Sequence, residues 1–159
     1  MSQAFVKEGD ASDDLPERPI SERPNYVTAE GLAALRSRHE ELSKRLAELK
    51  TKKGWESDPG VKVIERDLRY LEARNSSAIL VKRSGDKPNE VRFGTTVELK
   101  DAEGTKTYSI VGEDESDPAQ GKLSWSSPLA LALMGAKAGQ EITWPGPDGE
   151  NRLTVLSIT

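Results

Sequence analysis

The chain has 159 residues, of which 35% are hydrophobic and 31% charged, and its formal net charge at pH 7 is −4. Broad contact with nucleic-acid phosphates needs clustered Lys and Arg, so this acidic balance argues against direct binding to free DNA. The absence of Cys and the presence of one His exclude disulfides, thiolate chemistry and a His-rich metal site. The chain opens with no basic-then-apolar signal, and no apolar run approaches the roughly 18 residues of a membrane span, so we expect a cytoplasmic protein.

Residues 1–24 are rich in Asp and Pro and contain few apolar side chains. A segment of this kind cannot bury enough apolar surface to offset the entropy of ordering it. We therefore predict an extended or disordered arm at the start of the chain.

Two stripes with the spacing of a coiled coil follow the arm. Thr28 is a suitable N-cap for the first helix, although Gly31, three positions later, leaves no capping box. The seam positions then recur at steps of three and four residues, as is typical of heptads. The first stripe is Leu32, Leu35, His39, Leu42, Leu46 and Leu49, and the second is Val61, Ile64, Leu68, Leu71, Asn75 and Ala78.

The two stripes pair in antiparallel register about a single loop at 51–57, with Leu49 opposite Val61 and Leu32 opposite Ala78. Asp58 and Pro59 have the residue types of an N-cap and a first helical position. We therefore predict an antiparallel coiled-coil hairpin over residues 25–83. His39 and Asn75 fall in adjacent layers, where polar residues typically specify register.

Residues 84–89 have the composition of a linker, and beyond them the apolar pattern changes to the alternation of strands. We expect strands near 95–99, 106–111, 122–126, 140–144 and 152–158, and a short helix at 128–134 that begins with Pro128. Strands on both sides of a single helix indicate an α+β domain with an antiparallel sheet over residues 90–159.

Two parts of this sequence resemble the GreA/GreB transcription elongation factors. The run Val27-Thr28-Ala29-Glu30-Gly31-Leu32 opens a heptad helix, as the family's hairpin does. The strand 108–111, the acidic turn after it and the run 125–135 follow the order of the family's C-terminal domain. The resemblance covers about residues 27–159 and implies an FKBP-like C-terminal fold. It also implies a bacterial protein, not itself an enzyme, that has RNA polymerase as its partner and contacts nucleic acid only through the elongation complex.

In this family, carboxylates at the hairpin tip help the polymerase hold a Mg²⁺ ion and a water that cut backtracked RNA. The tip here, residues 52–59, lacks the family's acidic motif, and its only carboxylates are Glu56 and Asp58. Both are weak candidates for assisting catalysis or binding a polymerase-held magnesium, and no cofactor of the chain's own is expected. The hairpin is also about 15 residues shorter than the family's, which withdraws the tip by about 10 Å.

The resemblance also implies residues that bind polymerase. Ser126, Ser127, Pro128 and Leu129 match the element with which the family docks on the coiled-coil rim of the polymerase secondary channel. Ser127 is equally suited to capping the short helix. Trp55 would either pack inside the channel or fold back on its own hairpin. The acidic turn Glu113, Asp114, Glu115 and Asp117 would either complement a basic rim or stay solvated.

These observations predict a monomeric Gre-type elongation factor that binds polymerase at its secondary channel and modulates elongation, with or without stimulating transcript cleavage. One alternative is a non-cleaving channel regulator, like the regulators of nucleoside diphosphate kinase. Another is an interaction module unrelated to polymerase. The fold alone would allow a prolyl isomerase, but two Phe and three Trp in the whole chain are too few to line a proline pocket, so we reject that reading.

Overall fold

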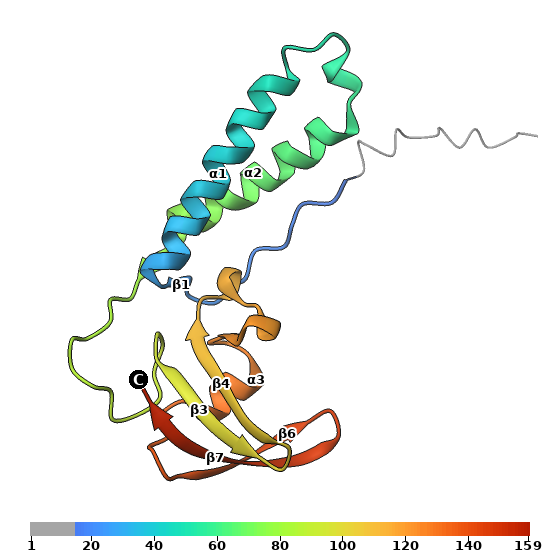
Figure 1. Ribbon diagram of the computed structural model, residues 1–159. Helices are drawn as coiled ribbons and strands as arrows, with labels where there is room; N and C mark the ends of the chain where they lie inside the picture. The colour runs from blue at the N-terminus through green and yellow to red at the C-terminus, as the bar shows by residue number, and fades with distance from the viewer. Residues whose placement is uncertain (1–14) are drawn as a thin grey trace, which may run out of the picture. The chain divides into compact units, whose positions relative to one another are not determined.

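The computed structural model describes residues 15–159 and is shown in Figure 1. It divides into two compact units: residues 15–23 with 34–77, and residues 24–33 with 78–159. None of the helices among the described residues is both long and apolar enough to cross a membrane.

Helices come first and the large sheet follows. The first half of the chain contains β1 (Tyr26–Val27), α1 (Ala29–Leu49), the 3-10 turn η1 (Trp55–Ser57), α2 (Pro59–Ser77) and β2 (Ile79–Leu80). The second half contains β3 (Thr96–Asp101), β4 (Gly104–Val111), η2 (Glu113–Glu115), η3 (Pro118–Gln120), β5 (Lys122–Ser124), α3 (Pro128–Leu133), β6 (Glu141–Gly146) and β7 (Gly149–Ile158). The predicted α+β class, a helical hairpin followed by a curled sheet, is confirmed.

The hairpin is held by the predicted apolar seam. Buried apolar side chains fall on the two facing stripes, at Leu35, Leu42, Val61, Ile64, Leu68 and Leu71. The Asn75 amide donates to the Leu35 carbonyl oxygen across the seam at 3.4 Å and to the Leu71 carbonyl oxygen at 2.9 Å, so one predicted layer is directly observed. His39 does not bond to Asn75; its Nε2 lies 3.4 Å from Glu72 Oε1 at the edge of the seam.

The C-terminal sheet has five strands in the order β5-β4-β3-β7-β6. All neighbouring pairs are antiparallel except β4 and β5, which pair in parallel and are joined by a connection that contains η2 and η3. The apolar core of this unit forms between the sheet and α3, and Figure 1 shows this helix beside the sheet. Its most buried members are Val97, Leu99, Ile110, Ala130, Leu133 and Val155.

The unit boundaries differ from the expected bounds of 25–83 for the hairpin and 84–89 for the linker. Residues 24–33 and 78–89 group with the sheet. The reason is a two-stranded parallel sheet in which Tyr26 and Val27 of β1 pair with β2. The Tyr26 ring also packs against Phe93 and Trp125, with ring centroids 6.0 and 5.1 Å away. These contacts join distant parts of the sequence, so helical periodicity could not reveal them.

A remote carboxylate completes the N-terminal cap of α1. Thr28 Oγ1 accepts a hydrogen bond from the Gly31 amide at 3.0 Å, as in a capping box. The partner of the Thr28 amide is Glu115 of η2, whose Oε2 accepts from it at 3.1 Å. The same carboxylate accepts from the Thr28 hydroxyl and, at 2.9 Å, from the Gly112 amide. A negative charge is favourable there, because the first amides of a helix are unpaired and carry the positive end of its dipole.

The carboxylate of Glu115 also explains why residue 31 is Gly. A Cβ at this position would overlap the carboxylate carbon and both its oxygens. Gly112 is under a similar constraint, since its Cβ would lie 2.5 Å from the Tyr26 carbonyl oxygen. The segments Thr28-x-x-Gly31 and Gly112-x-x-Glu115 can therefore pack this closely because neither glycine has a Cβ.

This arrangement predicts that Gly31→Ala changes the free energy of unfolding in opposite directions with and without the Glu115 carboxylate. Gly31→Ala should destabilise the protein by about 1–3 kcal/mol, because the displaced carboxylate gives up charged hydrogen bonds that outweigh the roughly 1 kcal/mol gain in helix propensity. In a Glu115→Ala background the same change should stabilise by up to about 1 kcal/mol. Urea unfolding of the four proteins measures both effects. The same sign in both backgrounds would contradict this account of Gly31.

Candidate functional site

The turn before α3 is fixed by hydrogen bonds from its own residues. Ser127 is the N-cap of α3, and its Oγ accepts from the Ala130 amide at 3.3 Å. The hydroxyls of Ser124 and Ser126 are 2.9 Å apart, and the Ser127 amide donates to the Ser124 carbonyl oxygen at 3.0 Å. The Trp125 amide donates to the Val111 carbonyl oxygen, which extends the β5 side of the sheet into the turn. The turn therefore holds α3 in a defined position.

The short helix α3 has one buried and one exposed side. Ala130 and Leu133 are fully buried in the core. Pro128 is exposed, and Leu131, three residues later on the same side of the helix, is 50% exposed. An isolated exposed leucine is common, but this one lies beside an exposed proline and a rigid serine turn. We call Ser126, Ser127, Pro128 and Leu131 the docking face.

Leu129, which the sequence analysis grouped with the docking residues, has a different environment. It is half-buried and packs against the apolar core of the sheet unit. It also lines a hollow of about 700 Å³ together with Tyr108, Trp144 and Leu153. Charged side chains surround this hollow, among them Lys106, Glu141 and Arg152. Leu129 thus helps to shape a concave, partly aromatic surface next to the docking face.

The acidic turn before β5 is only partly available to a partner. Glu115 is committed to the α1 cap, and Oε1 of Glu113 is buried without a hydrogen-bond partner among the described residues. Asp114 and Asp117 are exposed. The turn therefore contributes two surface carboxylates, where the sequence offered four.

The hairpin tip is basic and its aromatic residue is partly covered. Gly54, with φ of 82°, makes the turn into η1. The Lys50 ammonium lies 5.1 Å from the centroid of the half-buried Trp55 ring and 3.4 Å from Glu65 Oε1. Lys52 and Lys53 are exposed. Trp55 thus packs partly on its own hairpin and leaves the rest of its surface at the tip.

The two tip carboxylates are not equivalent. Glu56 is exposed on η1, whereas Asp58 Oδ1 accepts from the Gly60 amide at 2.8 Å at the start of α2. Asp58 therefore serves as the N-cap that the sequence predicted. Among residues 15–159, no three His, Cys, Asp or Glu side chains come together as a possible metal site. The tip provides one free carboxylate and a basic surface.

Sequence reasoning found the serine turn but missed Leu131. The available signal was the spacing of the helix itself, because Pro128 and Leu131 are three residues apart while Ala130 and Leu133 form the opposite stripe. A helix of six residues is too short for apolar periodicity to show which stripe is buried. The arrangement offers surfaces that can bind a partner at two places: the docking face and the tip.

Comparison with known proteins finds relatives that match most of the chain. The family "Transcription elongation factor, GreA/GreB, C-term" matches residues 78–159. The chain is 36% identical to the transcription elongation factor GreA of Rhizobium etli, over 98% of this chain and 92% of that protein. It is 32% identical to GreB of Neisseria meningitidis, over 87% of this chain and 95% of that protein.

Solved structures of related proteins give a looser match. GreA factor homolog 1 (Gfh1) of Thermus thermophilus shares 22% identity, covers 86% of this chain and 99% of its own, and superposes with a TM-score of 0.41. The GreA/GreB factor of Nitrosomonas europaea shares 25% identity, covers 85% of this chain and 98% of its own, and has the same TM-score.

Proposed function

Because the chain belongs to the GreA/GreB family of transcription elongation factors, we propose that it binds RNA polymerase at the secondary channel and modulates elongation. The protein supplies no reaction centre in this proposal. It acts by docking on the polymerase and placing its hairpin in the channel. Family membership, which rests on relatives that match most of the chain, is the observation that carries the proposal.

The docking face supports the first contact of this two-point mechanism. Ser126, Ser127 and Pro128 match the family's rim-binding element, and their turn is already ordered in the free protein. Preordering lowers the entropy cost of binding. Leu131 supplies an exposed apolar side chain, and Leu129 shapes the hollow beside it. Together they form a surface for an apolar knob on a helical partner, with charges at its margin.

The tip supports the second contact. Lys52 and Lys53 are exposed, and Lys50 lies over Trp55, so the tip carries positive charge into a channel that approaches RNA and its phosphates. Trp55 provides a partly exposed aromatic surface that can pack against the channel wall.

The tip also bears on the choice between cleaving and non-cleaving action. Magnesium is bound through carboxylate oxygens, and the capping bond of Asp58 leaves Glu56 as the one uncommitted carboxylate. A single carboxylate on a shortened hairpin is a poor partner for a metal held deep in the polymerase. We therefore favour a regulator that occupies the channel without stimulating cleavage.

The docking face gives the first test. Leu131→Glu should weaken binding to core RNA polymerase at least tenfold, about 1.4 kcal/mol or more, because it places a charge in an apolar contact. Leu156→Glu is the matched control, since Leu156 is 40% exposed on β7 and lies outside the docking face. Co-sedimentation with polymerase at micromolar protein and low salt measures both variants.

Equal weakening by the two glutamates would remove the docking face from the proposal. Failure of the unaltered protein to bind under these conditions would exclude the polymerase function and leave the interaction-module reading.

Transcript cleavage in stalled elongation complexes gives the second test. We expect inhibition of elongation and no cleavage above that of polymerase alone. Glu56→Gln with Asp58→Asn removes both negative charges of the tip while Asn retains the cap, so it should leave inhibition unchanged. Stimulated cleavage that this double variant abolishes would instead establish the tip carboxylates as the metal-assisting pair.

A further inference from the structure

Residues 15–23, the described segment before β1, carry two prolines around two charged residues. They include the run Pro16-Glu17-Arg18-Pro19, which has no regular secondary structure. Each proline fixes its own φ and also favours an extended backbone at the residue before it. Glu17 and Arg18 are therefore presented from a stiff segment that loses little entropy when it docks. We call residues 15–23 the strap.

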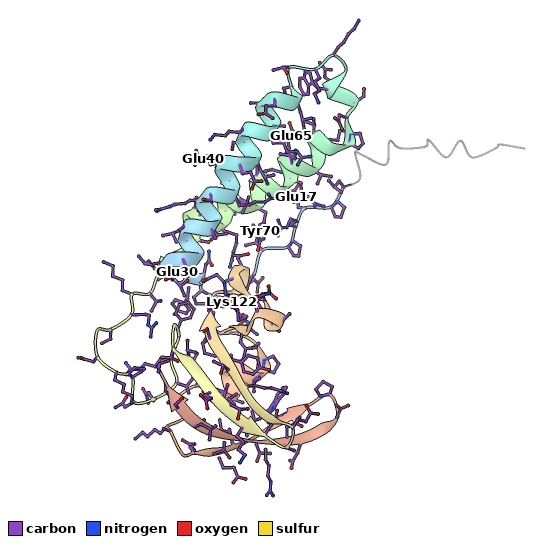
Figure 2. The ribbon with its side chains drawn as sticks, in the orientation of Figure 1. Glu17, Glu30, Glu40, Glu65, Tyr70 and Lys122 are labelled. Carbon is purple, nitrogen blue, oxygen red and sulfur yellow. The ribbon has the colours of Figure 1, made fainter. Side chains whose placement is uncertain are left out.

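Glu17 fixes the strap to α2 through a two-pronged ion pair. The Arg69 guanidinium donates to both carboxylate oxygens of Glu17, at distances of 2.6, 3.0 and 3.2 Å. These hydrogen bonds hold the pKa of Glu17 below its usual range and raise the pKa of Arg69. Paired planar groups of this kind specify orientation as well as proximity. Figure 2 labels Glu17 on the strap and Tyr70 on α2.

Arg18 adds a second pair of contacts within one turn of the first. Its guanidinium carbon lies 3.8 Å from the centroid of the Tyr70 ring, a cation–π stack. Its Nη1 lies 3.6 Å from Asp67 Oδ1. Adjacent strap residues thus engage Asp67, Arg69 and Tyr70, a single short stretch of α2. The strap therefore makes residue-specific contacts, whereas composition predicts only an extended or disordered arm.

The strap is held without being part of the hairpin core. The side chains of Glu17 and Arg69 are 61% and 55% exposed, and pairs this exposed are weak and screened by salt. The seam is formed by other residues of α2, among them Leu68 and Leu71. The strap can therefore leave α2 without unfolding it, so its docking is a separate feature of the molecule.

The position of the strap matters for a hairpin that enters a channel. Arg69 lies ten residues after Pro59, so the strap contacts α2 about 15 Å from the start of this helix. Each helix is about 10 Å across with its side chains, and the docked strap adds width on one flank. The hairpin is thus wider at the strap than two helices alone.

We propose that the strap is a collar that limits how far the hairpin enters the secondary channel of RNA polymerase. This inference rests on the proposed function and adds a regulatory part to it. In this proposal the added width at the strap meets the channel wall before the hairpin is fully inserted. The collar keeps the tip short of the reacting centre, and its release lets the tip advance.

The free protein gives the first half of the test. The chain has no Cys, so Ile20→Cys and Val63→Cys, both at exposed positions, can carry two spin labels. Pulsed electron resonance should give a narrow distance distribution for the unaltered strap and a broad one for Arg69→Glu. Glu17→Arg combined with Arg69→Glu reverses the pair and should restore the narrow distribution.

The polymerase complex gives the second half. A radical-generating probe on Lys53→Cys reports which polymerase and RNA sites the tip reaches. The Arg69→Glu variant should move these sites deeper by at least one helical turn, about 5 Å, and the charge-reversed pair should move them back. Arg38→Glu is the matched control, because Arg38 pairs with Glu41 on α1 and is 54% exposed, like Arg69.

An unchanged depth in a variant whose strap is shown to be released would overturn the collar and leave the strap a structural element. Deeper insertion by Arg38→Glu as well would assign the effect to charge alone and would also overturn it. If the unaltered protein does not bind polymerase, the proposed function is refuted, and the role of the collar with it. The distance measurement on the free protein would still establish that the strap docks on α2.

Discussion

The Glu115 carboxylate is the constraint on which the assembly of the sheet unit depends. It accepts from two backbone amides, Thr28 and Gly112, and from the Thr28 hydroxyl, so one side chain ties the first turn of α1 to the connection after β4. Charged acceptors on backbone amides are stronger than neutral ones and fix direction as well as distance. The β1–β2 pairing and the Tyr26 ring contacts then follow, because residues 26 and 27 immediately precede the cap.

Local patterns predicted the parts of this fold that local interactions build. Heptad spacing placed the seam of α1 and α2, and the types of Asp58 and Ser127 identified caps that the structure contains. The parallel pairing of β5, the β1–β2 sheet and the cap from Glu115 were missed, since each joins residues far apart in sequence. Gly31 illustrates the limit: as a missing capping-box residue it looked like a weak cap, but it leaves room for a carboxylate supplied from position 115.

For the candidate site, the resemblance located the serine turn, but it did not show which apolar side chain faces outward. Leu129 and Leu131 are two residues apart on a one-and-a-half-turn helix, and only packing against the core separates the half-buried one from the exposed one. The arm presents the same difficulty. Its composition indicates an extended chain, and nothing local to Glu17 shows that it has a partner 52 positions away.

The interactions of the acidic residues change what the net charge implies about partners. A net negative charge suggests a negative surface that complements a basic partner. Several of the carboxylates are instead used within the protein: Glu17 pairs with Arg69, Asp58 caps α2 and Glu115 caps α1. At the tip this leaves Lys52 and Lys53 exposed beside a single uncommitted carboxylate, Glu56. The hairpin therefore presents a basic end from an acidic protein, which suits contact with phosphate groups better than coordination of a metal ion.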